Sequence, residues 1–283
     1  MTLLLGRSAF GEAPTRAIVF ASRRISDGVR IRRAYPQRVI RAVLFDVDFT
    51  LARPGPELGP EGYRRAGKRH GLVLEPERYE ASRLAALASL QRHPELEHDD
   101  ELWIVFTEEI VRGMGGDVEG ARACAEDLVR AWELHERFTL YEDALPALAA
   151  LREHGVKIGL VSNGSRDLEE FVVHHALDVD CAIGSRAFGR TKPHPEIFLR
   201  ALALLDAEPE EAAMIGDSYE DDIEGARALG MKAFLLDRDG RYPDEPDRIP
   251  DLLALPAALG LIRKPDVTTV RPPEDAWKEG RGR

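Results

Sequence analysis

The chain has 283 residues, of which 44% are hydrophobic and 31% charged, a composition typical of a soluble globular protein with one large domain or two modest ones. No apolar run approaches the ~20 residues that cross a bilayer, and a net charge of −11 argues against a nucleic-acid groove as the main function. Cys124 and Cys181 lie far apart, with no second thiol nearby. We therefore expect two small buried hydrophobes in a reducing, cytoplasmic compartment, and neither a disulfide framework nor a zinc site.

The charge is unevenly distributed along the chain. Residues 1–41 contain nine arginines and two acids and carry +7, so the remainder carries −18. Residues 1–38 show no clear hydrophobic period, and Leu3–Leu5 is too short an apolar core for a secretory signal. We predict a poorly ordered N-terminal extension there; an organelle transit segment, or a stretch added by an upstream start codon, is the alternative.

An apolar run from Val39 to Phe45 leads into Asp46 and Asp48. Such a run predicts a strand buried on both faces of a parallel sheet. The aspartates then lie at the carboxyl end of the strand, where ligands bind in open α/β sheets, and they point the same way because they are two residues apart. Two carboxylates this close need a cation or a shared proton. A solvated acidic turn is the alternative for this motif taken alone.

The next stretch changes in character twice. Residues 52–60 are rich in proline and glycine, and we expect neither helix nor strand there. Amphipathic spacing, acidic first turns and glycine or proline stops then predict helices over residues 61–70, 76–92, 99–114 and 117–138. This long strand-free stretch indicates an inserted all-α lobe, with Trp103, Phe106 and Trp132 in its core.

From about Leu140 the sequence alternates between helix and strand patterns. The predicted helices cover residues 143–154, 166–176, 195–205, 221–229 and 250–259. The predicted strands cover residues 156–161, 181–183, 212–215 and 232–236. This alternation implies a parallel sheet with right-handed crossovers, and therefore an α/β fold.

Four short polar segments follow predicted strands or precede helices. They are residues 46–50, Ser162-Asn163-Gly164, Thr191-Lys192-Pro193, and Gly216-Asp217-Ser218 with Asp221-Asp222. Parallel strands would bring all four to one edge of the sheet. There, a carboxylate can attack phosphorus, a second carboxyl can transfer protons, and a lysine supplies compact positive charge. Further aspartates complete a site for Mg²⁺, which prefers oxygen ligands.

In their order along the chain, these segments resemble the motifs of the haloacid dehalogenase superfamily of hydrolases over roughly residues 39–260. The resemblance implies a Rossmann-like three-layer α/β core with a parallel sheet, formed by residues 39–56 and 139–262. It also implies that residues 57–138 are a helical-bundle cap over the site. Residues 263–283 are expected to form a disordered C-terminal tail.

The same resemblance implies roles for individual residues. Asp46 would be the nucleophile, Asp48 the general acid/base, and Lys192 would bind the phosphoryl group and stabilise the charged intermediate. The other groups expected to bind phosphoryl oxygens are those of Thr50, Ser162 and Asn163. The chain would therefore be a phosphatase of a small phosphorylated metabolite, with no nucleic-acid or membrane partner.

Mg²⁺ is the implied cofactor. Its expected ligands are the carboxylates of Asp46, Asp217 and Asp222 and the carbonyl of Asp48. We choose Asp222 over Asp221 because, in relatives, the acid directly before the apolar residue acts, and Ile223 follows Asp222.

One residue departs from the motif. Many relatives have glycine where Phe49 stands, so the turn after Asp48 is expected to have a different shape here. The Phe49 ring could pack under the cap, line the pocket or be buried in the interior, and the sequence does not decide among these three positions. Arg53 and Tyr63 are candidates for substrate contact where cap and core meet.

Other functions share these motifs. A sugar phosphomutase would use all four motifs and differs only in that a second hydroxyl, in place of water, attacks the aspartyl-phosphate. A 2-haloacid dehalogenase uses the same nucleophile, but Asp48 argues against it, because halide leaves without a proton. A catalytically idle binding scaffold would usually have lost one of the four polar groups.

Overall fold

The computed structural model describes residues 39–90 and 92–261. The predicted extension at 1–38 and the predicted tail at 263–283 lie outside the described residues. Within the described part, none of the helices is both long and apolar enough to span a membrane.

The core is built on a parallel sheet. Its described strands are β1 (Ala42–Phe45), β4 (Lys157–Ser162), β5 (Cys181–Gly184), β6 (Ala212–Gly216), β7 (Lys232–Leu236) and β8 (Arg248–Ile249). They are ordered β5-β4-β1-β6-β7-β8, and every neighbouring pair is parallel. β1 therefore lies in the middle, where the strand order reverses. The predicted α/β class and parallel sheet are confirmed.

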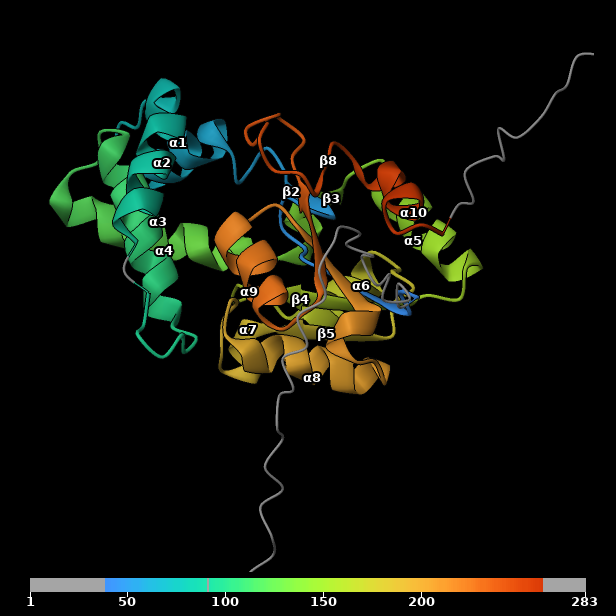
Figure 1. Cartoon of the computed structure of the whole chain (residues 1–283). Coiled ribbons are helices and arrows are strands. Elements are labelled where there is room, and N and C mark those ends of the chain that lie inside the picture. The colour runs from blue at the N-terminus through green and yellow to red at the C-terminus, as the bar shows by residue number, and fades with distance from the viewer. Residues whose placement is uncertain (1–38, 91, 262–283) are drawn as a thin grey trace, which may run out of the picture. The chain divides into compact units, whose positions relative to one another are not determined.

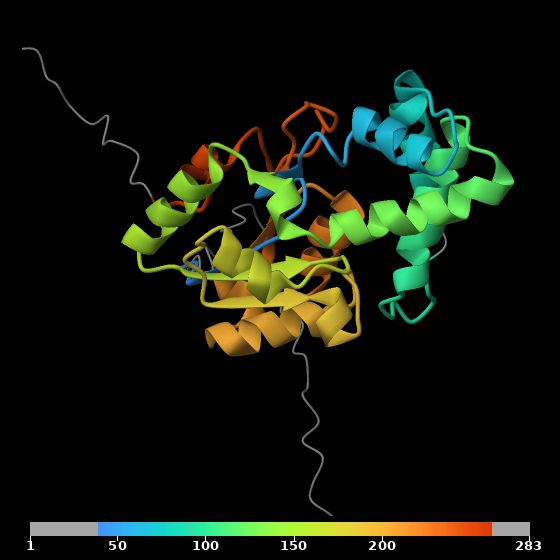
Figure 2. The same cartoon turned by 180° about the vertical axis from the view of Figure 1, so that it is seen from behind.

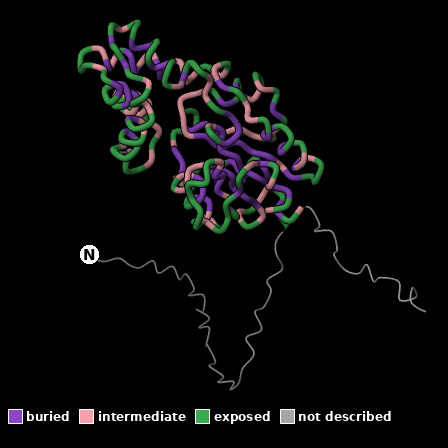
Figure 3. Tube along the Cα trace, turned by 90° about the horizontal axis from the view of Figure 1, so that it is seen from above, coloured by how far each residue is buried: buried purple, intermediate pink, exposed green. Residues whose placement is uncertain are grey.

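Helices cover both faces of this sheet (Figure 1). One face carries α5 (Ala144–Glu153), α6 (Leu168–His174) and α10 (Leu255–Ala258), and the other carries α8 (Pro195–Leu205) and α9 (Gly225–Ala228). The side chains of β1 alternate between the two cores: Val43 and Phe45 pack on one side, Leu44 on the other, and all are fully buried. Figure 3 shows the buried residues gathered in the interior of the core, with exposed residues around them.

The remaining short elements of the core connect these strands and helices. They are α7 (Ser185–Phe188), the 3₁₀ segments at Pro209–Glu211 and Leu252–Ala254, and a π-helical turn at Tyr219–Glu224 that leads into α9. The predicted helix at 221–229 is therefore a π turn followed by one short α-helical turn.

A helical insertion lies between β1 and β4. It contains α1 (Pro60–Arg69), a 3₁₀ turn at Pro76–Arg78, α2 (Tyr79–Ser89), α3 (Asp100–Gly113), α4 (Val118–Trp132) and a 3₁₀ turn at His135–Arg137. These helices bury a core of their own, which includes Tyr63, Ile110 and Cys124. Figure 2 shows α1 to α4 grouped together, with α4 leading back toward the sheet. We refer to this helical insertion as the cap.

Two sequence-based predictions about strands were wrong. Residues 52–60 were expected to hold no strand, but β2 (Ala52–Pro54) pairs antiparallel with β3 (Phe138–Leu140). Pro54 is tolerated because it ends a strand of a two-stranded ribbon, where no further ladder bond is required. The second omission is β8, whose two residues are too few to show any hydrophobic alternation. Cys124 is buried as expected, but Cys181 is only half-buried.

Candidate active site

The fold brings residues from separate loops together at the carboxyl ends of β1 and β6. Asp46 directly follows β1, and Asp217 directly follows β6. The amide N–H of Asp46 donates to the carbonyl of Ile215 at 2.9 Å, which fixes the end of one strand against the other. In open α/β sheets, ligands bind where the strand order reverses, and β1 occupies that place here.

Lys192 joins two of the acids. Its Nζ donates to Asp46 Oδ1 at 2.6 Å and to Asp222 Oδ1 at 2.7 Å, and its side chain is only 2% exposed. Burial by itself lowers the pKa of Lys192, but Asp222 and Asp46 outweigh it and raise the pKa above its ordinary value. The lysine is therefore a fixed positive charge between two carboxylates.

Asp46, Asp217 and Asp222 form an acidic cluster whose ligand atoms lie within 4.8 Å of one another. Gly216 makes this spacing possible, because a Cβ there would lie 2.0 Å from Asp222 Oδ2. Burial, followed by neighbouring carboxylates, raises the pKa of Asp217 well above its ordinary value. Burial also raises the pKa of Asp222 to about 7, against the opposing charge of Lys192.

This cluster fits a divalent cation. Burial raises the pKa of Asp46 despite the opposing charge of Lys192. Asp46 Oδ2 is buried and has no hydrogen-bond partner among the described residues. A buried carboxylate oxygen without a partner, beside two further carboxylates, is the donor set that a hard divalent ion prefers. The side chain of Asp48 is not part of the cluster. Magnesium itself stays a prediction.

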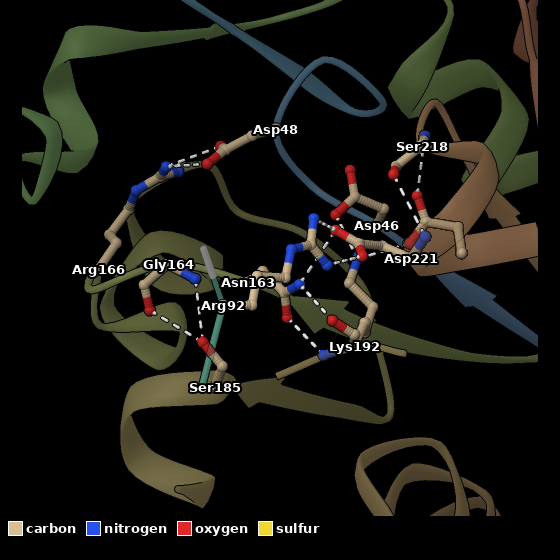
Figure 4. A network of polar contacts seen from close by, with 11 residues as sticks. Asp46, Asp48, Arg92, Asn163, Gly164, Arg166, Ser185, Lys192, Ser218 and Asp221 are labelled. Atoms are coloured by element: carbon tan, nitrogen blue, oxygen red, sulfur yellow. Dashed lines mark hydrogen bonds and ion pairs between the residues drawn. The ribbon is translucent and has the colours of Figure 1, made fainter. Parts of the chain in front are cut away.

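Asn163 fixes the loop that carries Lys192. Its amide Nδ2 donates to the carbonyl of Lys192 at 3.0 Å, and its Oδ1 accepts from the amide N–H of Lys192 at 2.7 Å (Figure 4). The amide is thus engaged in positioning the lysine, and phosphate binding by Asn163 stays a prediction. Ser162 ends β4 and is buried, and Thr50 is fully buried. Their predicted phosphate contacts are likewise untested.

Asp48 is held by an arginine that the sequence analysis missed. Nη2 of Arg166 donates to both carboxylate oxygens of Asp48, at 2.7 and 2.8 Å. The guanidinium lies over the rings of Phe138, at 3.7 Å, and Phe171, at 4.9 Å, which restricts its orientation. Arg166 stands in the same polar loop as Ser162-Asn163-Gly164, so a basic residue just beyond this motif was the available signal.

Asp221, the neighbour of Asp222, is bound to the cap. Its carboxylate accepts two hydrogen bonds from Arg92, one of them from Nη2 to Oδ2 at 3.1 Å, and another from Asn163 at 3.3 Å. The two adjacent aspartates therefore differ in their contacts: Asp222 binds Lys192, and Asp221 binds the segment between α2 and α3. Nothing in the sequence around Arg92 predicts this contact.

A cavity of about 250 Å³ opens above these residues. We call Asp46, Lys192, Asp217 and Asp222 the floor of this cavity. Asp48 and Asn163 also line it.

The other side of the cavity is formed by the cap. Trp103, Phe106 and Trp132 all line it. Phe106 also packs against the core of the cap, as expected, whereas Trp132 packs against one of the two cores of the sheet. Their helical spacing suits a buried face equally well whether a protein core or a cavity lies against it. Tyr63 lines the cavity, and its contact with a substrate stays a prediction, whereas Arg53 does not line it and lies over the ring of Tyr141.

Phe49 also lines the cavity, next to residues of the floor and of the cap. Its φ of +65° is in the left-handed region that favours glycine. Its ring lines the cavity 6.4 Å from that of Trp132. The residue thus adopts a backbone conformation suited to glycine and adds an aromatic ring to the cavity.

Comparison with known proteins agrees with this geometry. Residues 40–230 match the family model described as "haloacid dehalogenase-like hydrolase". The chain is 32% identical over 235 residues to the bovine haloacid dehalogenase-like hydrolase domain-containing protein 3, covering 79% of this chain and 92% of that one. It is 33% identical over 228 residues to the glyceraldehyde 3-phosphate phosphatase of Methanopyrus kandleri, covering 75% and 92%.

Solved structures of two activities are similar to this fold. A HAD phosphatase from Thermococcus onnurineus aligns with a TM-score of 0.56 and 26% identity, covering 78% of this chain and 98% of that one. A defluorinating L-2-haloacid dehalogenase aligns with a TM-score of 0.58 and 25% identity, covering 78% and 95%. Fold similarity by itself therefore does not show whether the enzyme cleaves a phosphate ester or a carbon–halogen bond, and the residues of the site must decide this.

Proposed function

The chain belongs to the haloacid dehalogenase-like hydrolase family, and on that premise we propose that it is a Mg²⁺-dependent phosphomonoester hydrolase. It acts on a small phosphorylated molecule through an aspartyl-phosphate intermediate. The observation that carries this proposal is the state of Asp46: Lys192 holds one carboxylate oxygen, while the other is buried without a partner beside two further acids.

The first step is displacement at phosphorus. A carboxylate oxygen of Asp46 attacks the phosphorus atom, and the bond from phosphorus to the alcohol oxygen breaks. The leaving oxygen takes a proton from Asp48, which lines the same cavity. Arg166 acts here as a positioning residue, because its two hydrogen bonds fix where the Asp48 carboxyl lies.

The second step returns the enzyme to its starting state. Asp48 takes a proton from water, the water oxygen attacks phosphorus, and the bond from phosphorus to Asp46 breaks. Inorganic phosphate leaves. Lys192 keeps its positive charge throughout and offsets the negative charge on the transferred group.

Asp46, Asp217 and Asp222 are the residues that would hold the divalent ion, with the carbonyl of Asp48 as the further ligand implied by the family. When bound, such an ion offsets the charge of the crowded carboxylates and of the phosphoryl oxygens.

The test uses an aryl phosphate with Mg²⁺. Wild type is compared with Asp46→Asn and Asp48→Asn, each with and without a chelator, and circular dichroism controls for folding. We expect wild-type turnover to be lost with the chelator and in Asp46→Asn. Turnover that survives both changes would refute the mechanism.

Two product measurements separate the alternatives. Release of inorganic phosphate distinguishes hydrolysis from phosphomutase transfer to a second hydroxyl. Halide release from 2-chloropropionate, undiminished in Asp48→Asn, would instead identify a dehalogenase, because that reaction needs no proton from Asp48.

A further inference from the structure

The cap side of the cavity is formed by matching faces of three helices. α3 places residues three or four apart along one side toward the cavity, and α2 and α4 do the same. The apolar residues among them are Tyr79, Leu87, Trp103, Phe106, Ile110, Val129 and Trp132. We call this set the roof. Because it faces a cavity, the roof leaves an apolar surface without a protein partner.

Trp103 is the roof residue that most directly indicates a ligand. Its ring packs edge-on against Phe106 with centroids 6.3 Å apart, so its position is defined by neighbours. Yet its indole Nε1 is buried and has no hydrogen-bond partner among the described residues. Buried tryptophan N–H groups usually find an acceptor. A ligand with an oxygen on or beside its ring would supply one.

The cations that line the cavity are already paired with acids. Lys192 binds Asp46 and Asp222, and Arg166 binds Asp48. The third, Arg83, donates to Glu80 of its own helix at 2.6 and 3.1 Å. Within the described lining, each of these three cations is therefore already paired with an acid, although Nε and Nη1 of Arg166 are buried without a hydrogen-bond partner.

The acid on the cap side of the cavity is also paired. Glu133 lines the cavity beside Trp132 and is bonded to Arg186 at 2.9 Å. An anionic leaving group under the roof would therefore meet paired charges and apolar rings, and would lose hydration there. A neutral leaving group has no such cost.

The cavity volume limits the size of the occupant. An engineered apolar cavity of about 150 Å³ binds benzene, and the cavity here measures about 250 Å³. One ring and a phosphoryl group therefore match the space. Aromatic side chains favour an aromatic partner, since rings pack edge-to-face or offset-stacked.

We propose that the substrate of this site is a phosphate monoester of a neutral alcohol that carries a single aromatic ring, held by the roof while the floor binds the phosphoryl group. This inference rests on the proposed phosphatase function. It predicts that substrates with a second phosphate or a carboxylate are poorer, and it makes Trp103 and Trp132 the residues that determine specificity.

Turnover is tested with esters of primary alcohols, so that the leaving oxygen is an alkoxide in each case. Benzyl phosphate carries the ring, ethyl phosphate lacks it, glycerol 1-phosphate replaces it with hydroxyls, and phosphoglycolate replaces it with a carboxylate. We expect kcat/KM for benzyl phosphate to exceed that for ethyl phosphate by on the order of tenfold to a hundredfold, because of the additional apolar surface buried. Phosphoglycolate is expected to be the poorest substrate.

Variants then test the roof. Trp103→Ala and Leu87→Ala should lower the benzyl-to-ethyl ratio by on the order of tenfold and severalfold respectively, and Trp103→Phe should keep most of it. Leu84→Ala is the matched control, because Leu84 lies on the same helix as Leu87 and is about equally exposed, at 51% against 48%, but does not line the cavity. Its ratio should equal that of wild type.

Binding separates this inference from the proposed function. Calorimetry measures the affinity of benzylphosphonate and ethylphosphonate, which cannot be hydrolysed. Tighter binding of benzylphosphonate without turnover of any ester would refute the phosphatase function, and with it the ester as substrate, but would support selection of an aromatic ring by the roof. Equal affinities, or an unchanged ratio in Trp103→Ala, would overturn the inference even if all esters are hydrolysed with dependence on Asp46.

Discussion

The floor and the roof of the cavity are held together by different forces. The floor consists of buried charges at short range: Lys192 binds two carboxylates, at 2.6 and 2.7 Å, and Asp217 completes the acidic cluster. The roof consists of aromatic and aliphatic side chains in van der Waals contact, such as Trp103 and Phe106, whose ring centroids lie 6.3 Å apart.

This difference suggests a division of tasks. Ionic contacts have strict distance requirements, and reaction at phosphorus depends on them. Apolar contacts are less directional, so one side chain can replace another while the chemistry continues below. Changes to the floor should therefore affect every substrate alike, and changes to the roof should alter the choice among substrates.

The largest expected effect comes from removing the charge of the floor. Lys192→Met leaves Asp46 and Asp222 buried without their shared partner, and breaking a buried ion pair costs roughly 3–5 kcal/mol. We expect kcat/KM to fall by on the order of a thousandfold or more for benzyl and ethyl phosphate alike. Steady-state kinetics and chemical unfolding measure both effects.

Lys232 provides the control for this substitution, because it is an exposed lysine on β7. Lys232→Met should match wild type in turnover and unfolding. A Lys192→Met enzyme within tenfold of wild type would show that the floor does not need this charge.

The second prediction concerns pH and metal in the floor. The folded-state pKa of Asp222 is about 7, and that of Asp217 is also raised, both chiefly by burial, whereas an unfolded aspartate titrates near ~3.9. For a group whose pKa is raised on folding, stability is fully present below the unfolded pKa and is lost as pH rises through the folded one. The metal-free protein should therefore become less stable between about pH 4 and 7.

Mg²⁺ should reverse this loss. A ligand at a hundredfold excess over its Kd adds about 2.7 kcal/mol, roughly 5–10 °C in Tm for a protein of this size. We expect a larger Mg²⁺-induced rise in Tm at pH 8 than at pH 5, measured by scanning calorimetry. Asp217→Asn should be more stable than wild type in the metal-free state at pH 8 and should show a smaller rise with Mg²⁺. Equal rises at the two pH values would contradict this account of the cluster.

The third prediction lies between floor and roof. Arg92 joins the segment after α2 to Asp221, and the pair is partly exposed, so its direct contribution to stability is small. Arg92→Ala frees Asp221 beside Asp222 and loosens the cap at the cavity. We expect kcat/KM to fall by about five- to tenfold, equally for benzyl and ethyl phosphate.

Arg78→Ala is the matched control, because Arg78 makes a surface ion pair with Glu75. This control should leave kcat/KM unchanged. If Arg92→Ala instead alters the benzyl-to-ethyl ratio, Arg92 acts through the roof.

The sequence predicted the floor better than the roof, for a physical reason. Asp46, Asp217 and Lys192 stand in short motifs close to strands. A parallel sheet brings the ends of its strands together whatever the length of the chain between them. Trp103 and Trp132 have helical spacing, which is the same for a protein core and for a cavity wall. Arg166 and Arg92 bind acids 118 and 129 residues away along the chain, and no local pattern encodes such a partner.

The smallest expected effect, and the last prediction, concerns Phe49, where the two regions meet. Hydrogen bonds across residues 47–52, such as that from the amide of Phe49 to the carbonyl of Ala52 at 2.7 Å, hold its φ at +65°. Phe49→Gly removes both the backbone strain and the ring, whereas Phe49→Ala removes only the ring. The glycine variant should therefore be more stable than the alanine variant, by about 1 kcal/mol in denaturant unfolding. Both should lose the same severalfold part of the preference for benzylphosphonate. Equal stability would show that the turn is relaxed with any side chain. An undiminished preference in both variants would show that Phe49 does not contact the aromatic ring of the ligand, so that Trp132 would be the selecting residue at this position.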